Sequence, residues 1–233
     1  MRFVAHLVGL AAASSVAWAS PLMAAEDKAA VEVSRSATLP LVAGGTVRVD
    51  KTWGDVSVEA WDNPTVEVML TATSKRAYTP AEADEARARL ARFDFDAKAA
   101  SPGEVAVTGV SPNASLLRPF GGKSGVSVRY AIKMPRTSSL VLRHDVGDVA
   151  VAGVQGDVDV ANDTGEIRLK LPMGPGVVVE TSSRIGDVEL GEELRGKGTF
   201  KRRALVGHRF SYQPATPERH IKAHVGIGGI TIS

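Results

Sequence analysis

The chain has 233 residues, with 28 basic side chains, 26 acidic side chains and no cysteine. The lack of cysteine excludes disulfides, thiolate metal sites and lipid attachment to an N-terminal cysteine. The near-neutral charge argues against a dedicated nucleic-acid-binding protein, which needs a clustered basic face.

Residues 1–25 have the pattern of a secretory signal peptide. Arg2 precedes an apolar run, and the Ala-Trp-Ala sequence at 17–19 is a cleavage site, with a second option at Ala24 or Ala25. The run is shorter than the ~20 residues that a membrane span usually needs, and an uncleaved anchor is the alternative to cleavage. We therefore expect an exported protein of the periplasm or cell surface, peripheral rather than integral to the membrane.

Most of the remaining chain alternates apolar and polar residues, which indicates short β-strands. We expect a lead-in and first strand within 26–44, followed by one β-strand-repeat domain at 45–233. The clearest strand patterns fall at 37–42, 46–50, 56–60, 65–73, 93–97, 104–108, 126–134 and 140–143.

One segment, 79–93, has the pattern of an inserted helix. Thr79 and Glu82 have the spacing of a capping box, and Pro80 occupies the first helical position. Ala83, Ala86, Leu90 and Phe93 follow at helical spacing. We predict a helix at 80–92 that lies across a sheet and could cover an open edge.

Residues 109–124 have the composition of a long loop. Its central part carries Leu116, Leu117 and Phe120, which is unusual for a solvated loop. These side chains either fold back onto the body of the protein or form an exposed contact patch.

A five-residue phrase recurs along the chain: Gly, an acidic residue, Val or Ile, a variable residue, then Val or Leu. Glycine allows a sharp corner, the acid faces solvent, and the two apolar residues share one buried side of a strand. The middle residue faces water, which fixes the register. The phrase occurs at 54–58, 147–151, 156–160, 165–169 and 186–190, with a variant at 228–232.

The spacing of the phrase is regular. Glycines 147, 156 and 165 are nine residues apart, and glycines 165, 186, 207 and 228 are twenty-one apart. Fixed periods of this size are typical of stacked units. The period favours a β-solenoid. A two-sheet β-sandwich would give much the same alternation and is the alternative.

The blocks at 53–62 and 130–135, with the glycine phrase that follows them, resemble bacterial exported proteins known as putative adhesins. These are β-strand-repeat proteins classed as a domain of unknown function. The resemblance covers about 45–232 and implies a single-chain β-helical fold in the cell envelope. It supplies no catalytic residues.

The motifs that could bind ions or phosphate are incomplete. In the nine-residue calcium repeat, Val154 and Val158 stand where a glycine and the ligand aspartate are needed. Residues 121–124 resemble the end of a phosphate-binding loop without its first glycine. His220 and His224 would lie ~13 Å apart on a strand, too far to share one ion. We predict no metal site, no cofactor and no catalytic residues.

A basic cluster comprises Lys197, Lys201, Arg202 and Arg203. It is either a solvated loop or charged edge, or a contact surface for an anionic envelope polymer or lipid head group.

These observations predict a non-catalytic cell-envelope protein, structural or adhesin-like, whose repetitive β surface binds a polymer or a partner protein and no nucleic acid. One alternative is an accessory regulator of envelope-stress signalling. A second is a β-helical carbohydrate-active enzyme, which would need two facing carboxylates in a cleft.

Overall fold

The computed structural model describes residues 28–112, 125–203 and 206–233. They form two β-sheets and one α-helix, α1 (Pro80–Leu90). The predicted signal peptide, 1–25, lies outside the described residues, as do Leu116, Leu117 and Phe120 of the predicted loop.

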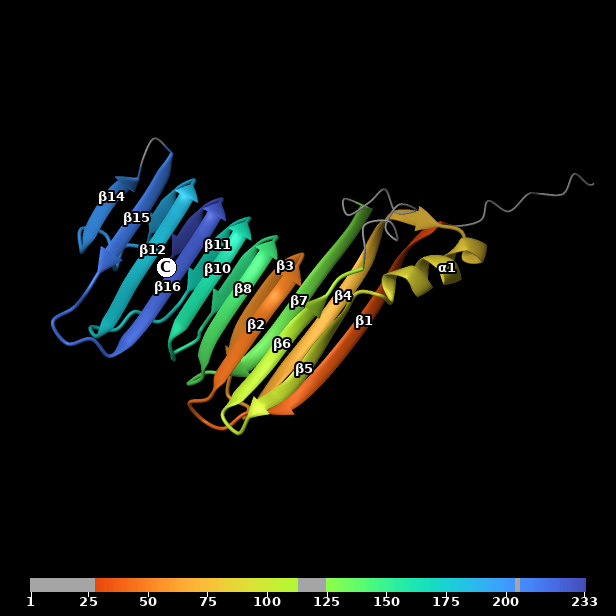
Figure 1. Ribbon diagram of the computed structural model, residues 1–233, viewed down its shortest axis with the longest axis horizontal. Helices are drawn as coiled ribbons and strands as arrows, with labels where there is room; N and C mark the ends of the chain where they lie inside the picture. Colours follow the sequence, from red (N-terminus) through yellow and green to blue (C-terminus); the bar gives the residue numbers. More distant parts are fainter. Residues whose placement is uncertain (1–27, 113–124, 204–205) are drawn as a thin grey trace, which may run out of the picture.

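Both sheets extend along the long axis of the molecule, with α1 at one end and the β14–β15 hairpin at the other (Figure 1). The eight-stranded sheet has the order β1 (Ala29–Pro40), β4 (Thr65–Tyr78), β7 (Val126–Pro135), β3 (Asp55–Trp61), β9 (Val149–Ala152), β11 (Ile167–Lys170), β17 (Ile230–Ile232), β13 (Val188–Leu190). The nine-stranded sheet has the order β14 (Thr199–Arg203), β15 (Gly207–Tyr212), β12 (Val177–Ile185), β16 (Arg219–Ile227), β10 (Val158–Thr164), β8 (Ser139–Val146), β2 (Thr46–Trp53), β6 (Glu104–Val110), β5 (Asp94–Ser101).

The central strands of both sheets pair in parallel. From β8 to β13 the chain alternates between the two sheets. As a result, β8 pairs with β10, and β9 pairs with β11. β16 pairs with β10 and β12, and β17 pairs with β11 and β13. Antiparallel ladders complete the ends, through β1, β4 and β7, through β5 and β6, and through β12, β15 and β14.

The predicted all-β class with one inserted helix is confirmed, and the two sheets fit the sandwich alternative. The predicted solenoid is not supported. A solenoid stacks its coils in chain order, whereas here the last strand pair, β16 and β17, lies between β10–β11 and β12–β13. The antiparallel strands at both ends also depart from a coil.

The glycine phrase makes tight corners between the sheets, but not at every occurrence. The corner glycines have φ values between 103° and 139°, and they stack on neighbouring strands in the order Gly54, Gly147, Gly165, Gly228, Gly186. Gly156 instead lies beside Ser138 at the other end of the strands, and Gly207 opens the antiparallel strand β15. The nine- and twenty-one-residue periods therefore combine positions with different structural roles.

The alternation within the phrase is confirmed. Val149 and Val151 are buried between the sheets, whereas Ala150 between them is exposed. The same pattern places Ile167 and Leu169 inside and Arg168 outside. Burial of one face of each strand supplies the apolar core that a chain without disulfides requires.

The helix is also confirmed, ending at Leu90 rather than at residue 92. The backbone N–H of Thr79 donates to the Glu82 carboxylate at 3.2 Å, as the capping box predicts. Ala86 and Leu90 are buried, and α1 packs against β1 and β4 at the edge of the eight-stranded sheet. The lead-in is partly regular, because β1 begins at Ala29.

Candidate functional site

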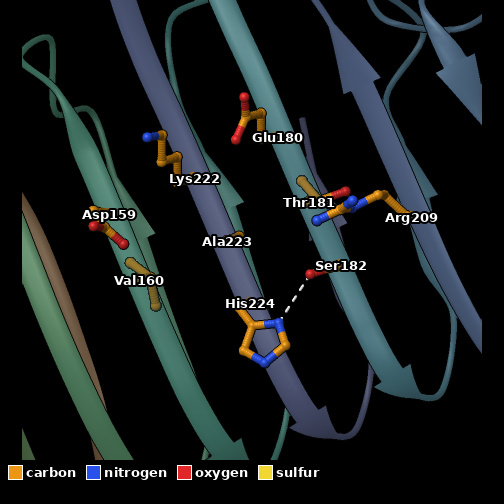
Figure 2. A pocket seen from close by; sticks show the side chains of 9 residues that line it. All are labelled: Asp159, Val160, Glu180, Thr181, Ser182, Arg209, Lys222, Ala223 and His224. Carbon is orange, nitrogen blue, oxygen red and sulfur yellow. Dashed lines mark hydrogen bonds between the residues drawn. The ribbon is translucent and has the colours of Figure 1, made fainter.

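The outer face of the nine-stranded sheet carries a shallow depression of about 200 Å³ over β10, β16, β12 and β15. Alternation along each strand turns its polar residues outward there. Its lining residues are Asp159, Val160, Glu180, Thr181, Ser182, Arg209, Lys222, Ala223 and His224 (Figure 2).

One row of this depression has alternating charge. Asp159 pairs across the ladder with Lys222, and Lys222 pairs with Glu180. The Arg143 guanidinium from β8 holds Asp159 through two bonds, of 2.8 and 3.0 Å. Lys222 and Glu180 thus face solvent as a hydrogen-bond donor and a hydrogen-bond acceptor, beside the Arg143–Asp159 ion pair.

The next row is polar and mostly basic. His224 pairs with Ser182, Ser182 with Arg209, and Arg209 with Lys201 on β14. The Ser182 Oγ and the His224 Nδ1 lie 2.9 Å apart, as the dashed line in Figure 2 shows. The first row therefore offers hydrogen-bonding groups on three neighbouring strands, and the second row offers them on four.

The structure separates the basic cluster that the sequence groups together. Lys201 lies in the row described above. Arg202 takes the alternate position on β14, opposite His208, so strand geometry places it on the other side of the ladder. Arg203 is opposite Gly207. Lys197, in the segment that joins β13 to β14, lines a separate depression of about 330 Å³ with Met173, Pro175 and Tyr212.

A column of buried polar side chains lies beneath the corner glycines, and sequence reasoning missed it. The Asn162 amide donates to the carbonyl of Gly147, and the Ser183 hydroxyl donates to that of Gly228, both at 2.8 Å. His144 Nδ1 lies 2.7 Å from the Thr52 hydroxyl. The signal was a polar residue three positions before glycine, and its role is to satisfy the corner carbonyls.

Burial lowers the pKa of His144, and the nearby carboxylates of Asp145 and Asp55 only partly oppose this effect. Because its side chain is 3% exposed, the neutral ring belongs to the interior and not to an accessible catalytic site.

The corner carboxylates are also structural. Asp55 Oδ1 accepts from the N–H of Asp148 at 3.3 Å, and Asp148 Oδ1 accepts from the N–H of Glu166 at 3.0 Å. The acidic residue of the phrase therefore links one corner to the next, which the prediction of a purely solvent-facing carboxylate did not include. Among the residues described, no group of three or more His, Asp or Glu side chains could hold a metal ion.

The predicted histidine pair lies on one strand, as expected. His220 and His224 both occupy outward positions of β16, with Lys222 between them. In 28–112, 125–203 and 206–233, no helix combines the length and the apolar character needed to cross a membrane.

No family model matches this sequence, and no curated protein is significantly similar to it. Among solved structures, a putative cell adhesion protein from Clostridium sporogenes aligns with a TM-score of 0.50 at 11% identity, over 86% of this chain and 99% of that one. A putative adhesin from Bacteroides fragilis aligns with a TM-score of 0.36 at 8% identity, over 86% and 97%. The first likeness shows a shared fold, and the second is too distant to add to it.

Proposed function

We propose that this protein is a non-catalytic, exported envelope protein with an adhesin-like role, and that the outer face of its nine-stranded sheet binds a polysaccharide. The observation that carries this proposal is the pair of polar rows in register across β10, β16, β12 and β15. The signal-peptide pattern and the fold shared with a putative cell adhesion protein support it.

The shape of the site favours an extended ligand. Pockets for small molecules usually enclose ~300–1,000 Å³. The depression holds about 200 Å³ and is open along the sheet. A polymer can lie along such a surface and add weak contacts from successive units.

The chemistry of the rows favours hydroxyl groups over a purely anionic ligand. Lys222 and Arg209 donate hydrogen bonds, and Glu180 accepts them. Sugar hydroxyls do both, so a balanced row of donors and acceptors can satisfy them. Lys201 extends the basic end of the second row and would favour a polymer that carries some acidic groups.

The enzyme alternative depends on Asp159 and Glu180, the two carboxylates of the depression. Lys222 stands between them in the ladder, and Arg143 holds Asp159 in a bidentate ion pair. This arrangement favours binding over acid–base catalysis, in which one carboxyl must carry a transferable proton.

The test is cosedimentation of the mature chain, from residue 26, with isolated envelope polysaccharides. We expect retention, and the double variant Glu180→Gln with Lys222→Gln should lower the affinity about tenfold or more, through loss of about 1.4 kcal/mol or more. The matched control is Glu59→Gln with Lys133→Gln, a cross-strand pair on the outer face of the other sheet, which should bind normally.

Equal losses in both double variants would contradict the proposed face. Release of shorter sugar chains during incubation would indicate the enzyme. Capture of one stoichiometric membrane protein from solubilised envelopes, without polymer retention, would favour the accessory regulator of envelope-stress signalling instead.

A further inference from the structure

An exposed apolar row follows the glycine corners. The residue just before each of three corner glycines is large, apolar and exposed: Val146 at 45%, Ile185 at 45% and Ile227 at 48%. Val146 and Ile227 lie two strands apart, on either side of Thr164, with which both pair, and Ile227 pairs with Ile185. Three exposed aliphatic side chains therefore fall in one line across four strands, with Thr164 between the first and the second.

The row continues at both ends. Trp53 pairs with Val146, and the carbonyl of Val206, which is 55% exposed, accepts from the N–H of Gly186 at 2.9 Å. We define the apolar ridge as Trp53, Val146, Thr164, Ile227, Ile185 and Val206. At about 4.8 Å per strand it is about 24 Å long.

The ridge is unlike ordinary exposed apolar residues. Single apolar side chains are common on protein surfaces, whereas several exposed apolar side chains in one line mark an interaction surface. At its Trp53 end, the ridge borders a hollow of about 520 Å³ whose walls include Val126 and Val128. Asp55 and Lys75 also line this hollow, so it offers apolar contact together with both signs of charge.

On β8 and β10, acidic residues lie on both sides of the ridge. Asp145 and Asp163 precede the ridge residues in the chain, and Asp148 and Glu166 follow the corner glycines. Asp145 and Asp163 are exposed. Arg168 is paired with Asp148 and Glu166, and the Arg184 guanidinium lies beside Gly226, next to Asp163. Each flank therefore carries one cation against two carboxylates and keeps a net negative charge.

We propose that the apolar ridge binds a cationic amphipathic helix of a partner protein. A helix of about 16 residues is about 24 Å long, which matches the ridge. Its apolar stripe would cover the ridge, and lysine or arginine beside the stripe would reach the acidic flanks. The same carboxylates would repel an anionic lipid surface. This site lies at the glycine corners and does not depend on the polysaccharide site.

The test uses the mature chain and a synthetic 18-residue peptide with leucine at helical spacing and lysine on both flanks. A peptide of the same composition, permuted so that no stripe forms, is the control. Titration calorimetry should show binding of the first peptide and at least about tenfold weaker binding of the second. Binding should weaken as salt increases, because the flanks are exposed charges.

Variants of the protein test whether the peptide binds at the apolar ridge. Ile185→Ser with Ile227→Ser should weaken peptide binding about tenfold, and Asp145→Asn with Asp163→Asn should lower its salt dependence. Met69→Ser is the matched control, since Met69 is 42% exposed on the outer face of the other sheet, and it should bind normally. The aspartate pair keeps the test informative if the serine variants unfold.

Three results would overturn the proposal. Equal binding of both peptides would show that the ridge does not recognise a stripe. A dimer in sedimentation velocity that the serine variants abolish would make the ridge a contact between two copies of this chain. Binding to anionic vesicles that the serine variants abolish would make it a lipid-binding surface.

Discussion

The two edges of the double layer satisfy their backbone carbonyls in different ways. At the glycine edge, the chain passes from one sheet to the other through single corners, and buried polar side chains such as Asn162 and Ser183 each bond the corner carbonyl of the neighbouring strand. At the opposite edge the connections are longer. There the Arg219 guanidinium alone donates to the carbonyls of Val154, Gly156 and Pro172, each at 2.7 Å.

This difference shows how turn length sets the means of stabilisation. Tight corners bring backbones into contact and leave room only for glycine and short polar groups. Longer loops leave several carbonyls pointing into one space, which a planar group with five donors can satisfy. One edge therefore distributes its polar contacts over many strands, and the other concentrates them in a single side chain.

The largest expected effect is at the glycine edge. In Gly165→Ala, a Cβ would lie 1.9 Å from the Gly147 carbonyl oxygen, at a φ of 135°. We expect the free energy of unfolding to fall by about 3 kcal/mol or more, measured by guanidinium denaturation. Gly174→Ala is the control, because nothing lies within 4 Å of its Cβ, and it should change little. Equal effects would mean that the corners are not tightly constrained.

At the opposite edge, Arg219→Met keeps the apolar stem and removes all three hydrogen bonds. We expect a loss of about 2–3 kcal/mol in the same measurement, since hydrogen bonds to charged groups are the stronger ones. Arg219→Lys should recover only part of it, because an ammonium lacks the planar fork. Full recovery by lysine would show that a point charge is enough there.

Asn162→Val tests whether the polar column acts strand by strand. Valine fits the column, since Val225 occupies it on β16, but it cannot donate to Gly147. We expect a loss of about 1–2 kcal/mol in the free energy of unfolding. Hydrogen exchange should increase first at the corner between β8 and β9. Exchange that increases uniformly would contradict a local role.

The smallest effect is a pH dependence from His144. Burial lowers its pKa in the folded state below the ordinary value of 6.5. The unfolded chain therefore binds more protons, and stability should decrease as pH falls below about 6.5. In His144→Asn this decrease should be smaller, measured as Tm between pH 7.5 and 5. The exposed His220→Asn is the control, and the same change in both variants would contradict the assignment.

Local pattern predicted the local structure well. The capping box at Thr79 placed the helix, and the alternation around Ala150 placed one buried and one solvated face. The phrase at 156–160 misled, because its glycine has the same neighbours in sequence as a corner glycine and lies at the opposite edge. The two-sheet order depends on which strands pair, and the phrase carries no information on that.

The candidate site shows the same limit. Charge alone singled out Lys201, but its neighbours in the row, Arg209, Ser182 and His224, come from three other strands. Lys201 and Arg202 are adjacent in sequence and fall on opposite sides of one strand. A cluster read along the chain is therefore not a cluster on the surface of a sheet.

The position of β16 and β17 has a consequence for how this chain folds. Both sheets are completed by residues 219–232, which fill the gap between β10–β11 and β12–β13. A chain still emerging from a ribosome lacks this piece and exposes unpaired strand edges on both sides of the gap. Closure is thus a late, long-range step, so folding is slow and the unfinished chain is most prone to aggregate just before its last strands arrive.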